Sequence, residues 1–374
     1  MHFSIFSFNM EEKNYLFFSF FNPKYNLLQL WLILCYNPIA EFDIYLTIFS
    51  KGRYMIMTAK NDVRKIALIG TGMVGMSFAY CLLNQTICDE LVLIDLDKKR
   101  AAGEAMDLNH GLAFAPGNMK IYAGSYEDCH DADIVTICAG VAQKPGETRL
   151  DLLKRNTAVF KSIVDPVVAS GFSGIFLIAT NPVDIMAHIT QKLSGFPKER
   201  VIGSGTALDS ARLRYLIGEY LNVDPRNVHA YVMGEHGDSE FVPWSQACLA
   251  TKPVLEICDE SDGEITRDML EGISENVKHA AYAIIDAKKA TYYGIGMALT
   301  RICKAILNNE NSILTVSAFL DGDYGQHDVY AGVPCILNQN GIRNILQLSL
   351  TKEEQEKFDF SCKTLKQFYE GIEV

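Results

Sequence analysis

The sequence predicts an α/β fold, a doubly wound parallel sheet followed by an α+β domain. A glycine-rich turn, Gly-Thr-Gly-Met-Val-Gly at 70–75, connects a strand-like run to a helix-like run. Strand-like and helix-like segments then alternate as far as residue 193, which is typical of parallel βαβ units. After residue 205 the pattern changes to long helices and short strands. The chain therefore divides into two parts of different architecture.

The first part, residues 57–205, contains the βαβ units. Its expected strands cover residues 65–69, 91–95, 120–123, 134–139 and 175–179. Its expected helices cover residues 77–84, 98–109, 150–169 and 183–193. Pro166 lies within the third of these helices and is expected to kink it.

The second part, residues 206–374, is the α+β domain. Its expected helices cover residues 207–221, 265–288, 296–307 and 352–369. Its expected strands cover residues 228–232, 313–319, 329–334 and 336–337.

Residues 1–56 fit neither part. Their most apolar run, residues 27–36, is followed by Pro38. It is much shorter than the about 20 residues that a bilayer span needs. Neither the basic segment nor the cleavage site of an export signal is evident. We interpret residues 1–56 as an N-terminal extension outside the fold, read from an early start codon, with a docking tail and an export signal as alternatives.

Composition narrows the class of protein. The chain has 374 residues, of which 49% are hydrophobic and 21% charged, and its net charge is −11. This acidity argues against nucleic acid or an anionic membrane as a partner. The ten cysteines form no Cys-x-x-Cys pair, and no histidine cluster has zinc spacing, so we expect no metal and a reducing, cytoplasmic compartment.

The glycine turn predicts a dinucleotide site. Gly70 permits the tight turn, Gly72 lets a pyrophosphate approach the backbone, and Gly75 allows close packing of helix on strand. Asp95 follows the next strand, where an acidic side chain accepts hydrogen bonds from a ribose diol and repels a 2′-phosphate. The sequence therefore favours NAD over NADP on a Rossmann domain. Asp95 as a turn residue and Arg100 as a solvated helix residue remain alternatives to cofactor contacts.

The loop at 138–149 leaves a carboxyl end of the sheet, where ligands of open α/β sheets bind. Its glycines and proline suit a closing lid. Arg149 would then polarise a carbonyl oxygen of a substrate, unless it only begins the following helix.

The run Gly-Glu-His-Gly-Asp at 234–238 places His236 on an irregular turn. A histidine is the natural proton donor in the reduction of a ketone. Asp209 would fix its tautomer, and Arg212, three residues further on the same helix face, would bind a substrate carboxylate. The alternatives are a core histidine and an intrahelical ion pair.

From residue 64 to 369 the chain resembles the L-lactate dehydrogenases of the lactate/malate dehydrogenase family, most closely those of Gram-positive bacteria. The resemblance is carried by GTGMVG, LVLIDLD, CAGVAQKPGETRLDLLKRN, ATNPVD, VIGSGTALDSARLR, VHAYVMGEHGDSE and ATYYGIGMAL. It implies reversible hydride transfer between NADH and pyruvate. It assigns His236 as proton donor, Asp209 as its partner, Arg149 as the lid arginine and Arg212 as the carboxylate anchor.

The resemblance also implies roles for further residues. Substrate contacts fall to Gln143, Asn181 and Thr291 beside the two arginines. Cofactor contacts beyond the glycines and Asp95 fall to Val74, Arg100, Tyr126, Gly140, Val141, Ser162, Thr180, Asn181, Ser204 and Ile295.

Substrate choice depends on Gln143, because a malate enzyme would need a cation to pair the second carboxylate. A malate enzyme, an enzyme for larger 2-keto acids and an NAD-binding relative without activity remain alternatives. The resemblance further implies a homotetramer in which Arg214 and His229 from two subunits bind fructose 1,6-bisphosphate as an activator. Without the resemblance these two residues would be ordinary surface residues.

Overall fold

The structure is a computed structural model. It describes residues 63–141, 149–370 and 372, together with the backbone of five strands between residues 2 and 59. The side chains at 149 and 150 are outside this description. Contacts divide the chain into two units, Met1–Val63 and Arg64–Val374.

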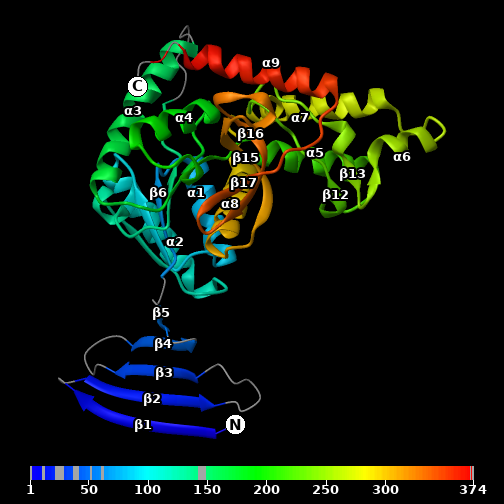
Figure 1. Cartoon of the computed structure of the whole chain (residues 1–374). Coiled ribbons are helices and arrows are strands. Elements are labelled where there is room, and N and C mark those ends of the chain that lie inside the picture. Colours follow the sequence, from blue (N-terminus) through cyan, green and yellow to red (C-terminus); the bar gives the residue numbers. More distant parts are fainter. Residues whose placement is uncertain are drawn as a thin grey trace. The chain divides into compact units, whose positions relative to one another are not determined.

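The first unit is an antiparallel sheet with strands in chain order (Figure 1). The strands are β1 (His2–Met10), β2 (Lys13–Phe21), β3 (Gln29–Tyr36), β4 (Phe42–Ser50) and β5 (Arg53–Ala59).

The second unit is built on a nine-stranded sheet of order β17-β16-β15-β11-β10-β9-β6-β7-β8. Its six parallel strands are β6 (Lys65–Ile69), β7 (Glu90–Ile94), β8 (Lys120–Ala123), β9 (Ile134–Ile137), β10 (Ile175–Ile178) and β11 (Val201–Gly203). Its antiparallel strands are β15 (Ser312–Asp321), β16 (His327–Asn338) and β17 (Gly341–Ile345). The two parts meet at one pair, where Gly203 of β11 lies opposite Ser317 of β15. The predicted fold class, with its doubly wound parallel sheet, is confirmed.

Helices cover the sheet and extend the second part (Figure 1). They are α1 (Met73–Gln85), α2 (Lys98–Gly111), α3 (Arg149–Ala169), α4 (Val183–Ser194), α5 (Ala207–Tyr220), α6 (Val254–Glu260), α7 (Arg267–Lys288), α8 (Tyr293–Leu307) and α9 (Lys352–Tyr369). Several have local start signals. Thr351 and Glu354 form a capping box on α9, and the Asp97 side chain accepts from the backbone N–H of Arg100 at the start of α2.

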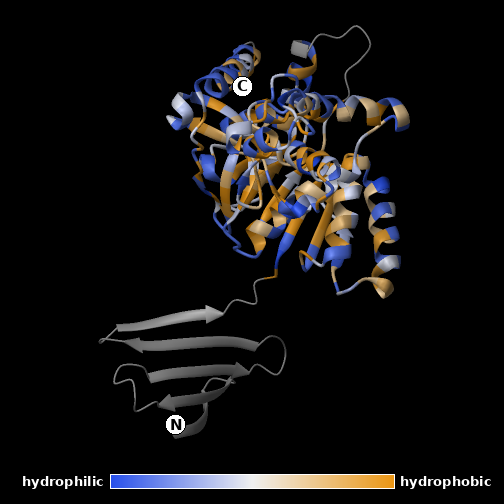
Figure 2. Ribbon diagram, turned by 90° about the vertical axis from the view of Figure 1, so that its right-hand side faces the viewer, coloured by the Kyte–Doolittle hydropathy of each residue, from blue (hydrophilic) through white to orange (hydrophobic). Residues whose placement is uncertain are grey.

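The parallel strands β6, β9 and β10 are buried on both faces, as their continuous apolar runs require. Figure 2 shows mostly hydrophobic colours along these strands. A second, smaller core lies around α5 and α7 and includes Leu213, Ile217, Trp244 and Val277. The second unit therefore contains two packed cores.

Several predicted elements differ from the structure. The strand expected at 228–232 is only β12, Val228–His229. The two short strands expected at 329–334 and 336–337 are one strand, β16. Its pairing with β15 continues through Pro334, where the sequence pattern predicted a break. The helix α3 runs as one element through Pro166. The sequence analysis also missed β11, β17 and α6, which are short and supported by their neighbours.

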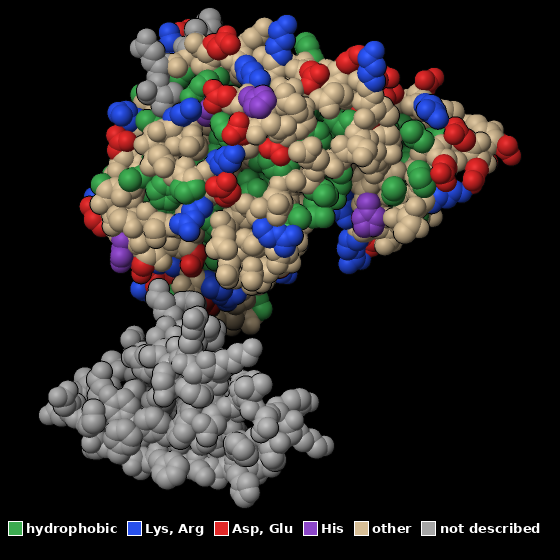
Figure 3. Space-filling model, viewed as in Figure 1, with side chains coloured by type: hydrophobic (Ala, Val, Ile, Leu, Met, Phe, Trp, Pro, Cys, Tyr) green, Lys and Arg blue, Asp and Glu red, His purple; other side chains and the backbone are tan. Residues whose placement is uncertain are grey.

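Basic and acidic side chains are interspersed over the described face in Figure 3. Within the described residues, none of the helices has the length and apolar character that a membrane span requires.

Candidate active site

The glycine turn has the geometry of a dinucleotide site. Gly70 has φ +101°, and a Cβ there would lie 2.6 Å from the backbone N of Ala139. A Cβ at Gly75 would lie 2.0 Å from the Gly70 carbonyl oxygen, so only glycine lets α1 pack this closely. A Cβ at Gly72, by contrast, would meet no atom within 4 Å. The backbone there is open to a ligand, and α1 begins with no side-chain cap on its N–H groups.

Asp95 directly follows β7 beside this turn. Its carboxylate accepts hydrogen bonds from the backbone N–H and the hydroxyl of Thr71, each at 2.8 Å, and from the Asp97 N–H at 3.0 Å. Burial alone would raise its pKa, but these donors lower it. Asp95 is therefore held ionised at the edge of the turn, and the open backbone and this anion fit a nucleotide with a free ribose diol.

The remaining cofactor-side residues divide into two groups. Gly140, Val141, Thr180 and Ser204 follow neighbouring strands of the sheet. The Thr180 hydroxyl donates to the Ala139 carbonyl at 2.7 Å, and the Val141 N–H donates to the Asn156 amide oxygen at 3.0 Å. The residues of the second group are half-buried or exposed, namely Val74, Tyr126, Ser162 and Ile295. Arg100 is half-exposed and forms a 3.8 Å ion pair with Glu104, which agrees with the solvated alternative.

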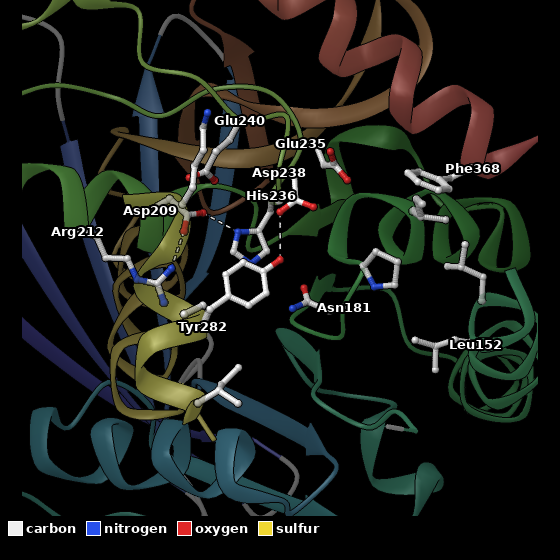
Figure 4. A pocket seen from close by; sticks show the side chains of 17 residues that line it. Leu152, Asn181, Asp209, Arg212, Glu235, His236, Asp238, Glu240, Tyr282 and Phe368 are labelled. Carbon is white, nitrogen blue, oxygen red and sulfur yellow. Dashed lines mark hydrogen bonds and ion pairs between the residues drawn. The ribbon is translucent and has the colours of Figure 1, made fainter. Parts of the chain in front are cut away.

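The predicted acid/base pair is assembled across 27 residues of sequence. Asp209, on α5, is 1% exposed. Its Oδ2 lies 2.6 Å from the Nδ1 of His236, and its Oδ1 accepts from the Arg212 guanidinium at 2.8 Å. Figure 4 shows both contacts and the second ring nitrogen of His236 facing the cavity. Nδ1 therefore carries a proton for Asp209, which leaves Nε2 for the substrate.

The charges set the protonation state of this pair. Burial disfavours the imidazolium, but the attraction of Asp209 outweighs it and raises the pKa of His236 to about 9. Burial likewise opposes ionisation of Asp209, yet His236 and Arg212 lower its pKa. His236 is thus ready to donate a proton at neutral pH.

Two buried acids beside His236 were missed by the sequence analysis. Asp184 of α4 accepts the His236 backbone N–H at 2.9 Å. Glu240 is 4% exposed, and one of its carboxyl oxygens lies within 4.8 Å of a ring nitrogen of His236 and of a carboxylate oxygen of Asp209. Burial, reinforced by the repulsion of Asp209, raises the pKa of Glu240 to about 9. Both residues belong to the motifs ATNPVD and GEHGDSE, but their contacts cross the fold, so sequence spacing gave no signal for them.

A cavity of about 310 Å³ opens in front of His236. Asn181, Asp209, Arg212 and His236 line it, as predicted, together with apolar side chains of α3, α7 and α9. Those apolar residues include Leu152, Ile285 and Phe368. At its mouth the Tyr282 hydroxyl donates to the Asp238 carboxylate at 3.1 Å (Figure 4). The cavity therefore combines a guanidinium and an imidazole with an apolar wall, and acidic side chains and Lys278 also line it.

Three predicted substrate residues are not placed in this cavity. Gln143 lies outside the described residues, and Arg149 begins α3 with a side chain outside the description. Thr291 is half-buried just before α8 and is absent from the residues that line the described cavity.

The two residues predicted to bind an activator lie away from the cavity. Arg214 is on α5, where its guanidinium donates to the Pro225 carbonyl at 3.2 Å. His229 is exposed on β12, which contacts α5. They share one region of the surface.

A Rossmann sheet with an open glycine turn, joined to a domain that presents a carboxylate-paired histidine and an arginine, defines an NAD-dependent dehydrogenase. Residues 64–203 match the family described as lactate/malate dehydrogenase, NAD binding domain, and residues 206–373 match its alpha/beta C-terminal domain. The chain belongs to the lactate/malate dehydrogenase family.

Individual members of this family are similar to the chain in sequence and in structure. L-lactate dehydrogenase 2 of Bacillus cereus is 56% identical over 308 residues, which cover 82% of this chain and 98% of the relative. L-lactate dehydrogenase 1 of Bacillus anthracis is 55% identical over the same shares. A lactate dehydrogenase from a Medee basin deep-sea metagenome library has a TM-score of 0.81 at 53% identity, covering 82% of this chain and 98% of that one. The minor L-lactate dehydrogenase of Enterococcus mundtii in its ligands-bound form has a TM-score of 0.82 at 49% identity, covering 84% and 100%.

Proposed function

We propose that this protein is an NAD-dependent L-lactate dehydrogenase that interconverts pyruvate and (S)-lactate. The hydrogen bonds that join Asp209 to Arg212 and to His236 at the cavity carry this proposal. They place an anchor for one carboxylate beside a proton donor. The names of the similar proteins support it as well.

The residues divide the reaction between them. Arg212 binds the carboxylate of the keto acid, and the bound cofactor supplies the hydride that reduces the carbonyl carbon. His236 gives its Nε2 proton to the carbonyl oxygen, and Asp209 stabilises the imidazolium before that transfer. We assign Arg149 to the lid over the carbonyl. In the other direction neutral His236 removes the hydroxyl proton of lactate.

The charge pattern of the cavity favours a monocarboxylate. Among the described lining residues, Glu235 and Asp238 are acidic, and Lys278 pairs with Glu275 at 2.9 Å. A second substrate carboxylate would face these acids unpaired, which is costly in a buried site. We place the remaining discrimination on Gln143.

Substrate preference tests this proposal. The specificity constant kcat/KM should be higher for pyruvate than for oxaloacetate, and Gln143→Arg should shift the preference toward oxaloacetate. A wild-type preference for oxaloacetate would indicate a malate enzyme. No oxidation of NADH with either acid would leave two alternatives, an enzyme for larger 2-keto acids and the NAD-binding relative without activity.

We further propose a homotetramer in which fructose 1,6-bisphosphate binds Arg214 and His229 of paired subunits. Cations brought together across a two-fold axis repel one another until phosphates neutralise them, which supplies a route to activation. Pyruvate titrations with and without the bisphosphate, with Arg214→Gln as the variant and Arg226→Gln as an exposed control, test it. A curve that the bisphosphate leaves unchanged would reject the activation and leave the catalytic assignment in place.

We also propose that residues 1–56 are dispensable, that residues 57–205 and 206–374 form the cofactor and catalytic domains, and that the protein acts in the cytoplasm. The nine cysteines of the second unit are free thiols, which suits a reducing compartment. A chain that begins at Met57 should keep the activity and melting temperature of the full chain. Loss of either would show that the N-terminal unit contributes.

A further inference from the structure

The main chain of His236 is held by a buried carboxyl that the proposed chemistry does not use. Asp184 lies in the first turn of α4 and is 2% exposed. Its Oδ2 accepts the His236 N–H at 2.9 Å, and its Oδ1 accepts the Ser317 O–H at 2.5 Å. Ser317 is fully buried where β15 meets β11. One carboxyl thus connects the cofactor domain, the junction of the sheet and the catalytic turn.

A neutral group holds the same turn from another side. The hydroxyl of Ser361, fully buried on α9, accepts the Glu235 N–H at 2.7 Å and shares a 3.1 Å hydrogen bond with Ser239. Gly234 has φ +95°, and a Cβ there would lie 2.5 Å from the Ser361 Oγ. The turn is therefore fixed between the hydroxyl of Ser361, which stays uncharged, and the carboxyl of Asp184, which can gain or lose a proton.

As a carboxylate, Asp184 accepts from both donors, and its charge strengthens both hydrogen bonds. A protonated carboxyl has an O–H of its own, so the Ser317 hydroxyl must rotate to accept from it. The hydrogen bond to the His236 N–H then becomes a weaker, neutral one. Burial raises the pKa of Asp184 to about 6, although the Ser317 O–H and the His236 N–H oppose this.

Those neighbours of Asp184 whose pKa is clearly shifted change charge at other pH values than Asp184. The charged or titratable groups that face Asp184 or share its small cavity are His236 and Glu235 on the turn, His188 on α4, Cys362, Lys366 and Tyr369 on α9, and Asp328 and Tyr330 on β16. Burial lowers the pKa of His188 to about 4 and raises that of Cys362 to about 12. His236 stays protonated up to about 9.

We propose that Asp184 is a positioning residue for His236: its ionised carboxyl keeps the imidazole aimed into the cavity, and its protonation weakens the hold on the turn. The proposal deepens the function given above, since it concerns the proton donor of that reaction. Asp184 acts through the main chain of His236 and touches no substrate.

The pH dependence of pyruvate reduction tests this. In the wild type, kcat/KM for pyruvate at saturating NADH should rise through about pH 6 and fall through about pH 9. Asp184→Asn presents one acceptor where the carboxylate presents two. It should lower kcat/KM at pH 7.5 by about 10- to 100-fold, the cost of a misplaced catalytic group, and abolish the rise near pH 6. An unchanged rise, or wild-type kcat/KM at pH 7.5, overturns the proposal.

Ser317→Ala is the second variant, and it keeps the carboxyl. Loss of its O–H removes a donor to the carboxylate, so the rise should move to higher pH without disappearing. A rise that does not move contradicts the proposal even if Asp184→Asn fails to fold.

A measurement without substrate separates this proposal from the proposed function. Histidine NMR follows the titration of His236, whose midpoint in the wild type should lie near pH 9. The negative charge of Asp184 contributes to that value, so Asp184→Asn should shift the midpoint to lower pH. A wild type inactive on pyruvate would reject the function, whereas an unshifted His236 midpoint would reject the role of Asp184.

Discussion

The cofactor turn and the catalytic turn are built in different ways. Around Gly70 and Gly75 the geometry is set by backbone atoms that leave no room for a Cβ. Around His236 it is set by buried polar side chains from three helices, Asp209 on α5, Asp184 on α4 and Ser361 on α9.

This difference predicts different sensitivities. The cofactor turn should respond to added volume, because its contacts are steric. The catalytic turn should respond to a change of charge or of hydrogen-bonding capacity, because its supports are acceptors in a buried setting. The variants below test the comparison, beginning with the largest expected effect.

Removal of the proton donor should have the largest effect. His236→Asn should lower kcat for pyruvate reduction by about 10²- to 10⁴-fold, the usual contribution of a positioned acid. NADH affinity should be kept, because the cofactor turn is built independently. His327→Asn is the matched control, since that histidine is exposed on β16 and has no role in the proposed sites. Stopped-flow turnover and NADH fluorescence titration would measure both, and near-normal turnover of His236→Asn would refute the assignment.

The ionisation of Asp184 should also make the free energy of unfolding depend on pH. Its pKa is raised to about 6, so the folded state binds this proton more tightly than the unfolded state. The resulting stabilisation is complete below the unfolded value of about 4 and is lost as pH rises through about 6, a difference of roughly 3 kcal/mol by pH 8.

Asp184→Asn removes this pH dependence. Relative to the wild type it should gain about 3 kcal/mol in unfolding free energy between pH 4 and pH 8. Urea denaturation at both pH values measures the difference. An equal difference at both would mean that the pKa of Asp184 is the same in the folded and the unfolded state.

Added volume distinguishes two glycines of the cofactor turn. Gly75→Ala should lower stability by about 1–3 kcal/mol, because its Cβ overlaps the Gly70 carbonyl and α1 must shift. Gly72→Ala should leave the melting temperature unchanged, since its Cβ meets open space, and should lower only the affinity for NADH. Thermal denaturation and NADH titration of both variants check this, and equal destabilisation would contradict it.

The smallest effect is expected at Arg100. Its ion pair with Glu104 is half-exposed and 3.8 Å long, so Arg100→Ala should change stability by less than about 0.5 kcal/mol. NADH affinity decides its role. An unchanged Kd would leave Arg100 as a solvated helix residue, while a clear loss would restore the predicted contact with the cofactor.

Local sequence patterns predicted the parts of the molecule that local forces build. Strand β6, the glycine turn and the capped helix α9 agree with prediction because a continuous apolar run, steric restriction and capping each act within a few residues. Motifs also located His236, Asp209 and Arg212, and the fold brings all three to one cavity. The two-residue strand β12 was predicted too long, because the following residues run toward the catalytic turn and leave the sheet.

The tertiary structure alone decided how the catalytic turn is supported. Asp184 and Ser317 are 133 residues apart and meet only because β15 joins the sheet beside β11. Ser361 reaches Glu235 across 126 residues, and Glu240 gains its raised pKa from burial beside Asp209. Sequence by itself determined which residue types were available for chemistry, since type and spacing are local properties. Burial and distance are properties of the packed chain, and they determine which of those residues hold a charge, accept a proton or position another group.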